Sequence, residues 1–386
     1  MQNKLALTKE ILRNLVSYPV LPGESNLQII NYIADYLELH GIKAELIYSE
    51  DKTRANLFAT IGPRIQGGMM LSGHTDVVSV AGQNWTNDPF ELLEINNRLY
   101  GRGAVDMKGF LACCLACVPQ WQQLKMNRPI QLGITYDEES GGFGAKRLAQ
   151  WLQNSDLKPA CSIIGEPTEM TIIAGHKGGF EISTKITGIE AHSCNPEHGV
   201  NAVHYAARII NFILDKGEQL KQNSNQDSIF NPPYSSFNIG KIQGGSSVNT
   251  IAGHCEFDWE LRPLPNDDGE KILAEIDNYC QQHLLVQMRK EFPLANIETD
   301  IKIFVPALAI NKDSQLIKMI ARLTGNDLYD VVAFGTDAGY FQNIGIDSVV
   351  YGPGSINQAH KPDEYIDVEE IEKCLSFLNK LHDCLI

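Results

Sequence analysis

The strongest constraint on the fold is an alternation of short apolar runs of strand length with longer runs that repeat at helical spacing. Met69–Ser72, Ile130–Tyr136 and Ala160–Ile164 are predicted strands. Met107–Leu124 and Ala145–Leu152 lie between them and are predicted helices. Strands that alternate with helices along a chain are typical of a sheet with helices packed on it. The sequence therefore predicts an α/β domain.

This alternation is interrupted after Gly175-His-Lys-Gly-Gly179 and returns from Ile310. Between these points the predicted order is strand, helix, strand, strand, helix, strand, over Phe180–Thr187, Val200–Leu214, Phe237–Ile242, His254–Leu261, Lys271–Leu284 and Ile297–Val305. That order is the one of a small ferredoxin-like α+β unit. We therefore predict a discontinuous main domain of residues 1–178 and 305–386, with a second domain of residues 179–304 inserted into it.

The charge balance limits the possible partners. The chain of 386 residues has 47 Asp and Glu against 32 Lys and Arg, which gives a net charge of −15. Nucleic-acid-binding proteins normally present a basic surface, so this balance argues against nucleic acid and against an anionic membrane as partners. No apolar stretch approaches the roughly 20 residues of a membrane span. The N-terminal residues also lack the apolar core of a signal peptide.

The nine cysteines show no spacing typical of a disulfide framework, which predicts reduced thiols in a cytoplasmic protein. Cys114 and Cys117 have the spacing of a CxxC pair, but they lie inside the apolar run Phe110–Val118 and no second pair accompanies them. This context favours a buried helix face over a redox or zinc site.

Residue types that bind metals or exchange protons gather where predicted strands end. They are His74 and Asp76 after the first strand above, Asp137, Glu138 and Glu139 after the second, Glu166 after the third, His360 in a late loop, and Asp106 just before a helix. Each feature alone has an ordinary alternative, such as a capped turn, a helix N-cap or a solvated acidic turn. Together they gather at the carboxyl ends of strands, where open α/β sheets bind ligands.

The residue types also indicate the kind of metal. Imidazole and carboxylate ligands without cysteine suit a catalytic zinc ion or a neighbouring divalent ion, and not a closed structural zinc site. Two histidines and three carboxylates are too many for one tetrahedral ion, but they suit two ions that share a bridging carboxylate. Because side chains two apart on an extended chain point the same way, we expect the Asp76 carboxylate to accept a hydrogen bond from the His74 ring.

The order of these motifs resembles that of the M20 family of di-zinc aminoacylases and carboxypeptidases, over essentially the whole chain. The motifs are Gly73-His-Thr-Asp76, Gly103-Ala-Val-Asp-Met-Lys-Gly109, Asp137-Glu-Glu139, Gly165-Glu-Pro-Thr168 and the late His360. The resemblance implies a mixed-sheet, zinc-peptidase-like catalytic domain with two Zn²⁺ ions per subunit, for which Co²⁺ is a plausible substitute.

The resemblance further implies a role for each residue of these motifs. His74 and Glu166 would hold one ion, Glu139 and His360 would hold the other, and Asp106 would bridge the two. Glu138 would be the general base on a metal-bridging water, and Asp76 would steer the His74 ring. The Asp106–Met107 peptide bond would be cis.

The same resemblance assigns roles in the inserted domain, which would act as a lid and a dimerisation domain. His192 would polarise the scissile carbonyl, and Arg262 with Asn249 would grip the α-carboxylate of a small N-acyl amino acid substrate. An ordinary surface histidine and a strand-end arginine are the alternatives. The family pattern implies a homodimer in which His192 reaches the partner subunit's metals. A non-catalytic binding protein of the same fold would have no need of Glu138.

Overall fold

The computed structural model describes residues 2–381 and 384, and it divides into two compact units. One unit consists of Met1–Gly175, Ile310–Val331 and Thr336–Ile386. The other consists of His176–Ala309 and Val332–Gly335.

The first unit is built on a mixed sheet of eight strands in the order β1-β2-β6-β3-β7-β16-β8-β15. These strands are β1 (Ala44–Tyr48), β2 (Ala55–Ile61), β3 (Met69–His74), β6 (Ile130–Thr135), β7 (Cys161–Ile164), β8 (Ile172–His176), β15 (Tyr329–Val332) and β16 (Asp347–Val350). β3 runs parallel to β6 and β7, and β16 runs parallel to β7. β2 is antiparallel to both β1 and β6. The predicted α/β class with a mixed sheet is confirmed.

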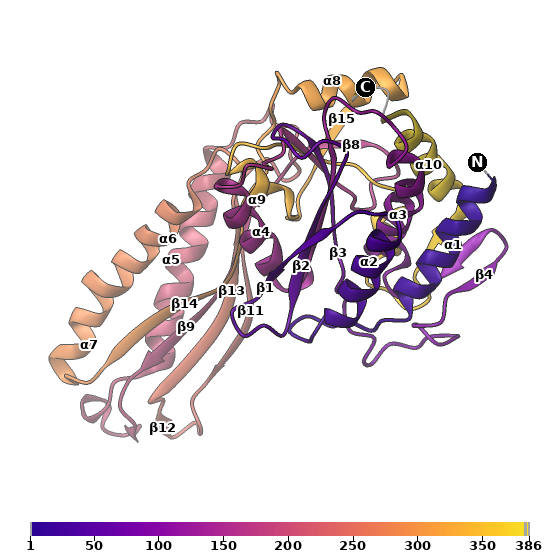
Figure 1. Cartoon of the computed structure of the whole chain (residues 1–386). Coiled ribbons are helices and arrows are strands. Elements are labelled where there is room, and N and C mark those ends of the chain that lie inside the picture. The colour runs from indigo at the N-terminus through magenta and orange to yellow at the C-terminus, as the bar shows by residue number, and fades with distance from the viewer. Residues whose placement is uncertain (1, 382–383, 385–386) are drawn as a thin grey trace. The chain divides into compact units, whose positions relative to one another are not determined.

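Helices cover both faces of this sheet (Figure 1). One face carries α1 (Gln2–Val16), α2 (Leu27–Leu39), α3 (Gly109–Trp121) and α10 (Val368–Leu381), and the other carries α4 (Phe143–Gln153) and α9 (Ala338–Gln342); α8 (Gln315–Thr324) completes the set. Apolar side chains dominate the core under α1, α2, α3 and α10, where Thr8 of α1 and Glu370 of α10 are also buried. Cys114 and Cys117 are buried free thiols of α3, which confirms the prediction of a helix face.

A small sheet of order β17-β5-β4 stands beside the segment that carries Asp106. Its strands are β4 (Leu93–Ile95), β5 (Arg98–Tyr100) and β17 (Tyr365–Asp367). The pairing of β17 with β5 joins two parts of the chain that are far apart in sequence, with Tyr365 opposite Tyr100. It therefore brings the residues before Tyr365 to the segment that follows Tyr100.

The second unit has the antiparallel strand order β11-β13-β9-β14, with β9 (Gly179–Thr187), β11 (Ser236–Gly244), β13 (His254–Arg262) and β14 (Asn296–Val305). Its helices are α5 (Ala202–Gln222), α6 (Gly269–Asn278), the π-helical stretch Tyr279–Leu285 and α7 (Val286–Glu291). A separate pair, β10 (Ala191–His192) and β12 (Thr250–Ile251), lies at one end of the sheet. Buried and more exposed residues alternate along β13, because its apolar side chains face the helices and its polar ones face outward.

Candidate metal centre and substrate-binding residues

The structure brings together the six residues that were predicted to bind or act with metals in the first unit. His74 ends β3, Asp106 lies in a short π-helical turn (Ala104–Lys108), and Glu138 and Glu139 open a 3-10 turn (Glu138–Ser140) after β6. Glu166 follows β7, and His360 follows the 3-10 turn Ile356–Gln358, which comes after β16. Most of these side chains thus lie at the carboxyl ends of neighbouring strands.

Asp106 stands between the two histidines. Its Oδ1 lies 3.1 Å from His74 Nε2, and its Oδ2 lies 3.2 Å from His360 Nε2. His74 Nε2 is also 3.6 Å from Glu166 Oε1, and His360 Nε2 is 3.1 Å from Glu139 Oε2. A carboxylate with one oxygen toward each imidazole is the arrangement that a bridging ligand needs.

The donor set fits divalent cations. Ligand atoms of His74, Asp106 and Glu139 lie within 4.8 Å of one another, as do those of His74, Glu138 and Glu166. Glu166 Oε1 is buried and accepts no hydrogen bond within the described residues. Burial raises the pKa of the Glu138 and Glu166 carboxyls well above the usual range, and for Glu166 the charge of Asp106 raises it further. Cations held between these carboxylates would remove that cost.

Asp76 orients the His74 ring, but not with the group that the sequence predicted. His74 Nδ1 lies 2.9 Å from the main-chain oxygen of Asp76 and 3.6 Å from its Oδ1. A carbonyl oxygen only accepts, so Nδ1 carries the proton and Nε2 is left to face Asp106 and Glu166. The Asp76 carboxylate instead accepts hydrogen bonds from the backbone N–H groups of Glu138 (3.2 Å) and Glu139 (3.1 Å).

Two further features shape the acidic turn and the bridge. Asp137 has a φ of 55°, accepts a hydrogen bond from Gly23 N at 2.9 Å and pairs with Arg54, which anchors the residue just before Glu138. The Asp106–Met107 peptide bond is cis, and this prediction is confirmed.

His192 and Asn249 lie side by side in the second unit. Ala191–His192 pairs with Thr250–Ile251, and the N–H of Ser193 donates to the main-chain oxygen of Asn249 at 3.0 Å. His192 is exposed, and its Nδ1 accepts a hydrogen bond from Cys194 N at 3.2 Å, which leaves Nε2 toward solvent. The structure therefore places the exposed His192 residue beside the backbone of Asn249.

Arg262 is not part of that cluster. It ends β13, whereas Asn249 lies in the loop before His254, the first residue of the same strand. The nine residues of β13 separate the two ends by about 26 Å at roughly 3.3 Å per residue. Arg262 is ion-paired with Glu260 at 2.9 Å. Within one chain, Asn249 and Arg262 are therefore too far apart to bind the same carboxylate.

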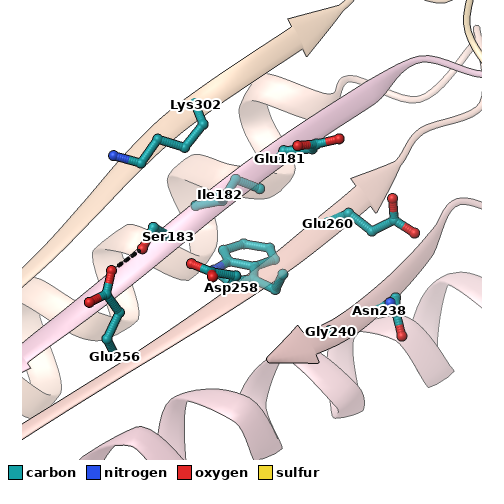
Figure 2. A pocket seen from close by; sticks show the side chains of 10 residues that line it. Glu181, Ile182, Ser183, Asn238, Gly240, Glu256, Asp258, Glu260 and Lys302 are labelled. Atoms are coloured by element: carbon teal, nitrogen blue, oxygen red, sulfur yellow. Dashed lines mark hydrogen bonds between the residues drawn. The ribbon is translucent and has the colours of Figure 1, made fainter. Parts of the chain in front are cut away.

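The outward face of the four-stranded sheet carries a polar hollow of about 510 Å³, none of whose lining residues was a predicted site residue (Figure 2). Acidic side chains of β9 and β13 dominate it, and Ser183 donates a hydrogen bond to Glu256 across the two strands. Glu256 also pairs with Lys185, at 3.6 Å. Asp258 and Glu260 likewise pair with Lys241 and Arg262, so these acidic side chains already have partners and we assign the hollow no ligand.

Sequence reasoning missed Gln83, Arg102 and Glu364, which are hydrogen-bonded around the backbone of the Asp106 and His360 segments. Glu364 lies close after His360 in sequence, but Gln83 and Arg102 stand in no pattern that would have singled them out.

Comparison with known proteins places the chain in a family. Residues 70–383 match the model of peptidase family M20/M25/M40, so the chain belongs to this family. The fold and site are accordingly those of a metal-dependent hydrolase of amide bonds. No helix of the described residues is long and apolar enough to cross a membrane.

Curated relatives extend the similarity over nearly the full length. An acetylornithine deacetylase of Pasteurella multocida is 33% identical and covers 93% of this chain and 91% of its own length. One from Aliivibrio fischeri is 35% identical with the same coverage.

Solved structures share the fold at lower identity. A tripeptidase from Staphylococcus aureus has a TM-score of 0.72 at 22% identity and covers 98% of each chain. A Bacillus subtilis protein described as a dinuclear metal binding peptidase of the M20 family has a TM-score of 0.66 at 15% identity, and covers 99% of this chain and 98% of its own.

Proposed function

We propose that this protein is an acetylornithine deacetylase, which hydrolyses N2-acetyl-L-ornithine to L-ornithine and acetate as a step of arginine biosynthesis. The observation that carries the proposal is the similarity, at 33–35% identity over nearly the whole chain, to relatives of that name. The family alone supports the coarser statement that the protein hydrolyses N-acyl amino acids with the help of metal ions.

The proposed ligand set follows the distances between side chains. His74 and Glu166 would hold one ion, Glu139 and His360 would hold a second, and Asp106 would contribute one oxygen to each. Zinc suits this imidazole and carboxylate set, and cobalt is its plausible substitute. When bound, such ions supply Lewis acidity, which lowers the pKa of water and polarises a carbonyl oxygen.

Glu138 is the proposed general base. It belongs to the same cluster as His74 and Glu166, yet the other five residues complete the ligand set without it. Its carboxylate would accept a proton from the attacking water and donate that proton to the departing amine nitrogen. The hydrogen bonds that the turn's backbone N–H groups donate to Asp76, together with the Arg54–Asp137 pair, hold the backbone that presents Glu138.

His192, Asn249 and Arg262 are proposed to act on the substrate across a homodimer. His192 would donate a hydrogen bond to the acetyl oxygen as negative charge develops there. Because Asn249 lies beside His192 and far from Arg262, we propose that one subunit supplies His192 and Asn249 while the other supplies Arg262 to the same substrate. An isologous contact through the inserted domain would create two such sites.

A cytoplasmic location is proposed for the enzyme. All nine cysteines lie among the described residues and are free thiols, as expected in a reducing compartment.

A substrate panel tests the proposed activity. The purified protein, supplied with zinc, would be assayed with N2-acetyl-L-ornithine, N-succinyl-diaminopimelate and a dipeptide, and release of the free amine would be measured. We expect kcat/KM to be highest for acetylornithine. A higher kcat/KM for the succinyl compound or the dipeptide would assign the chain to another N-acyl amino acid hydrolase or to a carboxypeptidase of the family.

A further inference from the structure

We propose that Gln83, Arg102 and Glu364 are positioning residues that hold the proposed metal ligands Asp106 and His360 in place. The inference rests on the metal-binding roles proposed above and adds residues to which no role has been assigned. All three belong to the first unit. They form one continuous hydrogen-bonded chain, which we call the ligand clamp.

One end of the clamp holds the backbone at Asp106. Glu364 is 1% exposed, and its Oε1 accepts hydrogen bonds from Val105 N at 3.0 Å and Asp106 N at 3.2 Å. Its Oε2 accepts from Arg102 Nη1 at 2.6 Å, and Arg102 is also 1% exposed. A buried carboxylate whose two oxygens are both engaged in this way has little freedom to move. Glu364 thereby fixes the two consecutive peptide groups that lead into the bridging carboxylate.

The other end of the clamp holds the backbone at His360. Gln83 Oε1 accepts from Arg102 Nη2 at 2.6 Å and from Trp85 Nε1 at 2.9 Å. Both partners only donate, so this atom is the amide oxygen and Gln83 Nε2 must be a donor. Nε2 donates to the main-chain oxygen of His360 at 3.0 Å. Arg102 additionally lies over the Trp85 ring, 5.0 Å from its centroid.

His360 needs such support because of its backbone and its exposure. Its φ is 63°, in the left-handed region that side chains other than glycine rarely adopt. Its side chain is 53% exposed, so few packing contacts restrain it. A loop in this conformation would hold Nε2 near Asp106 and Glu139 only if its backbone were tied to a fixed structure. The clamp provides that tie through Gln83.

The clamp contacts the ligands of the two ions unequally. It bonds to the backbone of Asp106 and His360, whereas no hydrogen bond of the described residues joins Gln83, Arg102 or Glu364 to His74 or Glu166. Loss of the Gln83 end should therefore weaken chiefly the ion held by Glu139 and His360, whereas loss of the Glu364 end acts on Asp106, which would contribute to both ions. Residues that orient metal ligands typically change metal affinity by about 10- to 100-fold when they are replaced.

Titration of the metal-free, full-length protein with Co²⁺ tests the inference, with calorimetry and visible absorption as readouts. The variants His360→Ala and Glu166→Ala identify which binding step belongs to which ion. Gln83→Met removes all the side-chain hydrogen bonds at the His360 end of the clamp, and Gln83 is only partly buried, so folding should survive. We expect about a 10- to 100-fold rise in the Kd of the step that His360→Ala abolishes, and less than about a 3-fold change in the other.

Glu370→Gln is the matched control. Glu370 Oε2 accepts a hydrogen bond from Gly354 N at 3.0 Å, in the segment that leads to His360, but it contacts no proposed ligand. This variant should leave both steps within about 3-fold of the parent. Glu364→Gln provides a second test from the Asp106 end, because the one amide oxygen cannot replace both carboxylate oxygens, of which one accepts from Val105 N and Asp106 N and the other from Arg102. Thermal unfolding of each metal-free protein checks that the variants are folded.

Three results would overturn the inferred role of the clamp. They are equal weakening of both cobalt-binding steps by Gln83→Met, a loss of cobalt affinity in Glu370→Gln as large as that in Gln83→Met, or unchanged cobalt binding in both Gln83→Met and Glu364→Gln. None of these experiments measures hydrolysis. A result that refutes the clamp therefore leaves the proposed deacetylase activity unaffected. If the parent protein binds cobalt but does not release ornithine from acetylornithine, only the proposed identity of the substrate is refuted. A parent that binds no cobalt refutes the proposed ligand set and the clamp together.

Discussion

A homodimer in which His192 serves the partner's site is the prediction that depends most directly on the geometry of the second unit. His192 and Asn249 lie at one end of β13 and Arg262 lies at the other, about 26 Å away. A substrate the size of an amino acid cannot reach both ends of one sheet. Residues at both ends can contribute to one site only if two chains meet there.

The perturbation is a mixture of two inactive chains, His192→Ala and Glu138→Gln. If His192 acts in trans, a mixed dimer has one site with both lesions and one site with neither. Random reassociation of equal amounts gives mixed dimers as about half of the population, so about one quarter of the parent's specific activity should return. Mixed dimers purified with two different affinity tags should show about half.

The assay unfolds the two variants together, refolds them with zinc and measures release of ornithine. Each variant refolded alone gives the background. Arg262→Ala mixed with Glu138→Gln is the matched control. If Arg262 and Glu138 of one chain serve the same site, neither site of that mixed dimer is intact and activity should stay at background. Absence of recovery with His192→Ala, in purified mixed dimers, would refute the trans assignment.

Two further predictions concern affinity and pH. Arg262→Ala should lower kcat/KM for acetylornithine by about 10- to 100-fold, since a charged hydrogen bond contributes about 1.5–3 kcal/mol. With acylated amines that lack a carboxylate, the same substitution should change kcat/KM little. An equal loss of kcat/KM with both kinds of substrate would give Arg262 another role. Burial lowers the pKa of His176 to about 4 from 6.5, so the unfolded chain takes up a proton first as the pH falls. The metal-free parent should therefore lose about 3 kcal/mol of stability between pH 6.5 and 4 that His176→Gln retains, as chemical unfolding at each pH would measure. Parallel pH profiles for the two proteins would contradict this.

The sequence was sufficient to predict that most of the candidate metal ligands cluster at one edge of the sheet, because they follow strands whose apolar runs are continuous. Buried parallel strands read as apolar runs, and the residue after each run falls at the shared edge of the sheet. His74, Glu139 and Glu166 are all found in this way. The cis peptide after Asp106 was predicted from the family resemblance alone, because local sequence gives no signal for it.

Other features depend on contacts that sequence patterns do not carry. The strands β4, β5 and β17 have three residues each, too short for a period of two to be recognised. Gln83 acts through the tertiary approach of its loop to His360, and nothing in its neighbourhood marks it. Asn249 and Arg262 were paired from the resemblance, but their separation follows from the length of β13 and from which end each residue occupies.

The central claim is that Glu138 moves the proton while the other residues of the cluster hold the metals, and Glu138→Gln tests it most directly. Metal content and the rate of ornithine release would be measured on the same preparation. The account predicts two ions per chain, as in the parent, with the rate reduced by about 100-fold or more, because general acid–base catalysis typically contributes 10²–10⁴-fold. A near-normal rate, or loss of one ion in the variant, would contradict it.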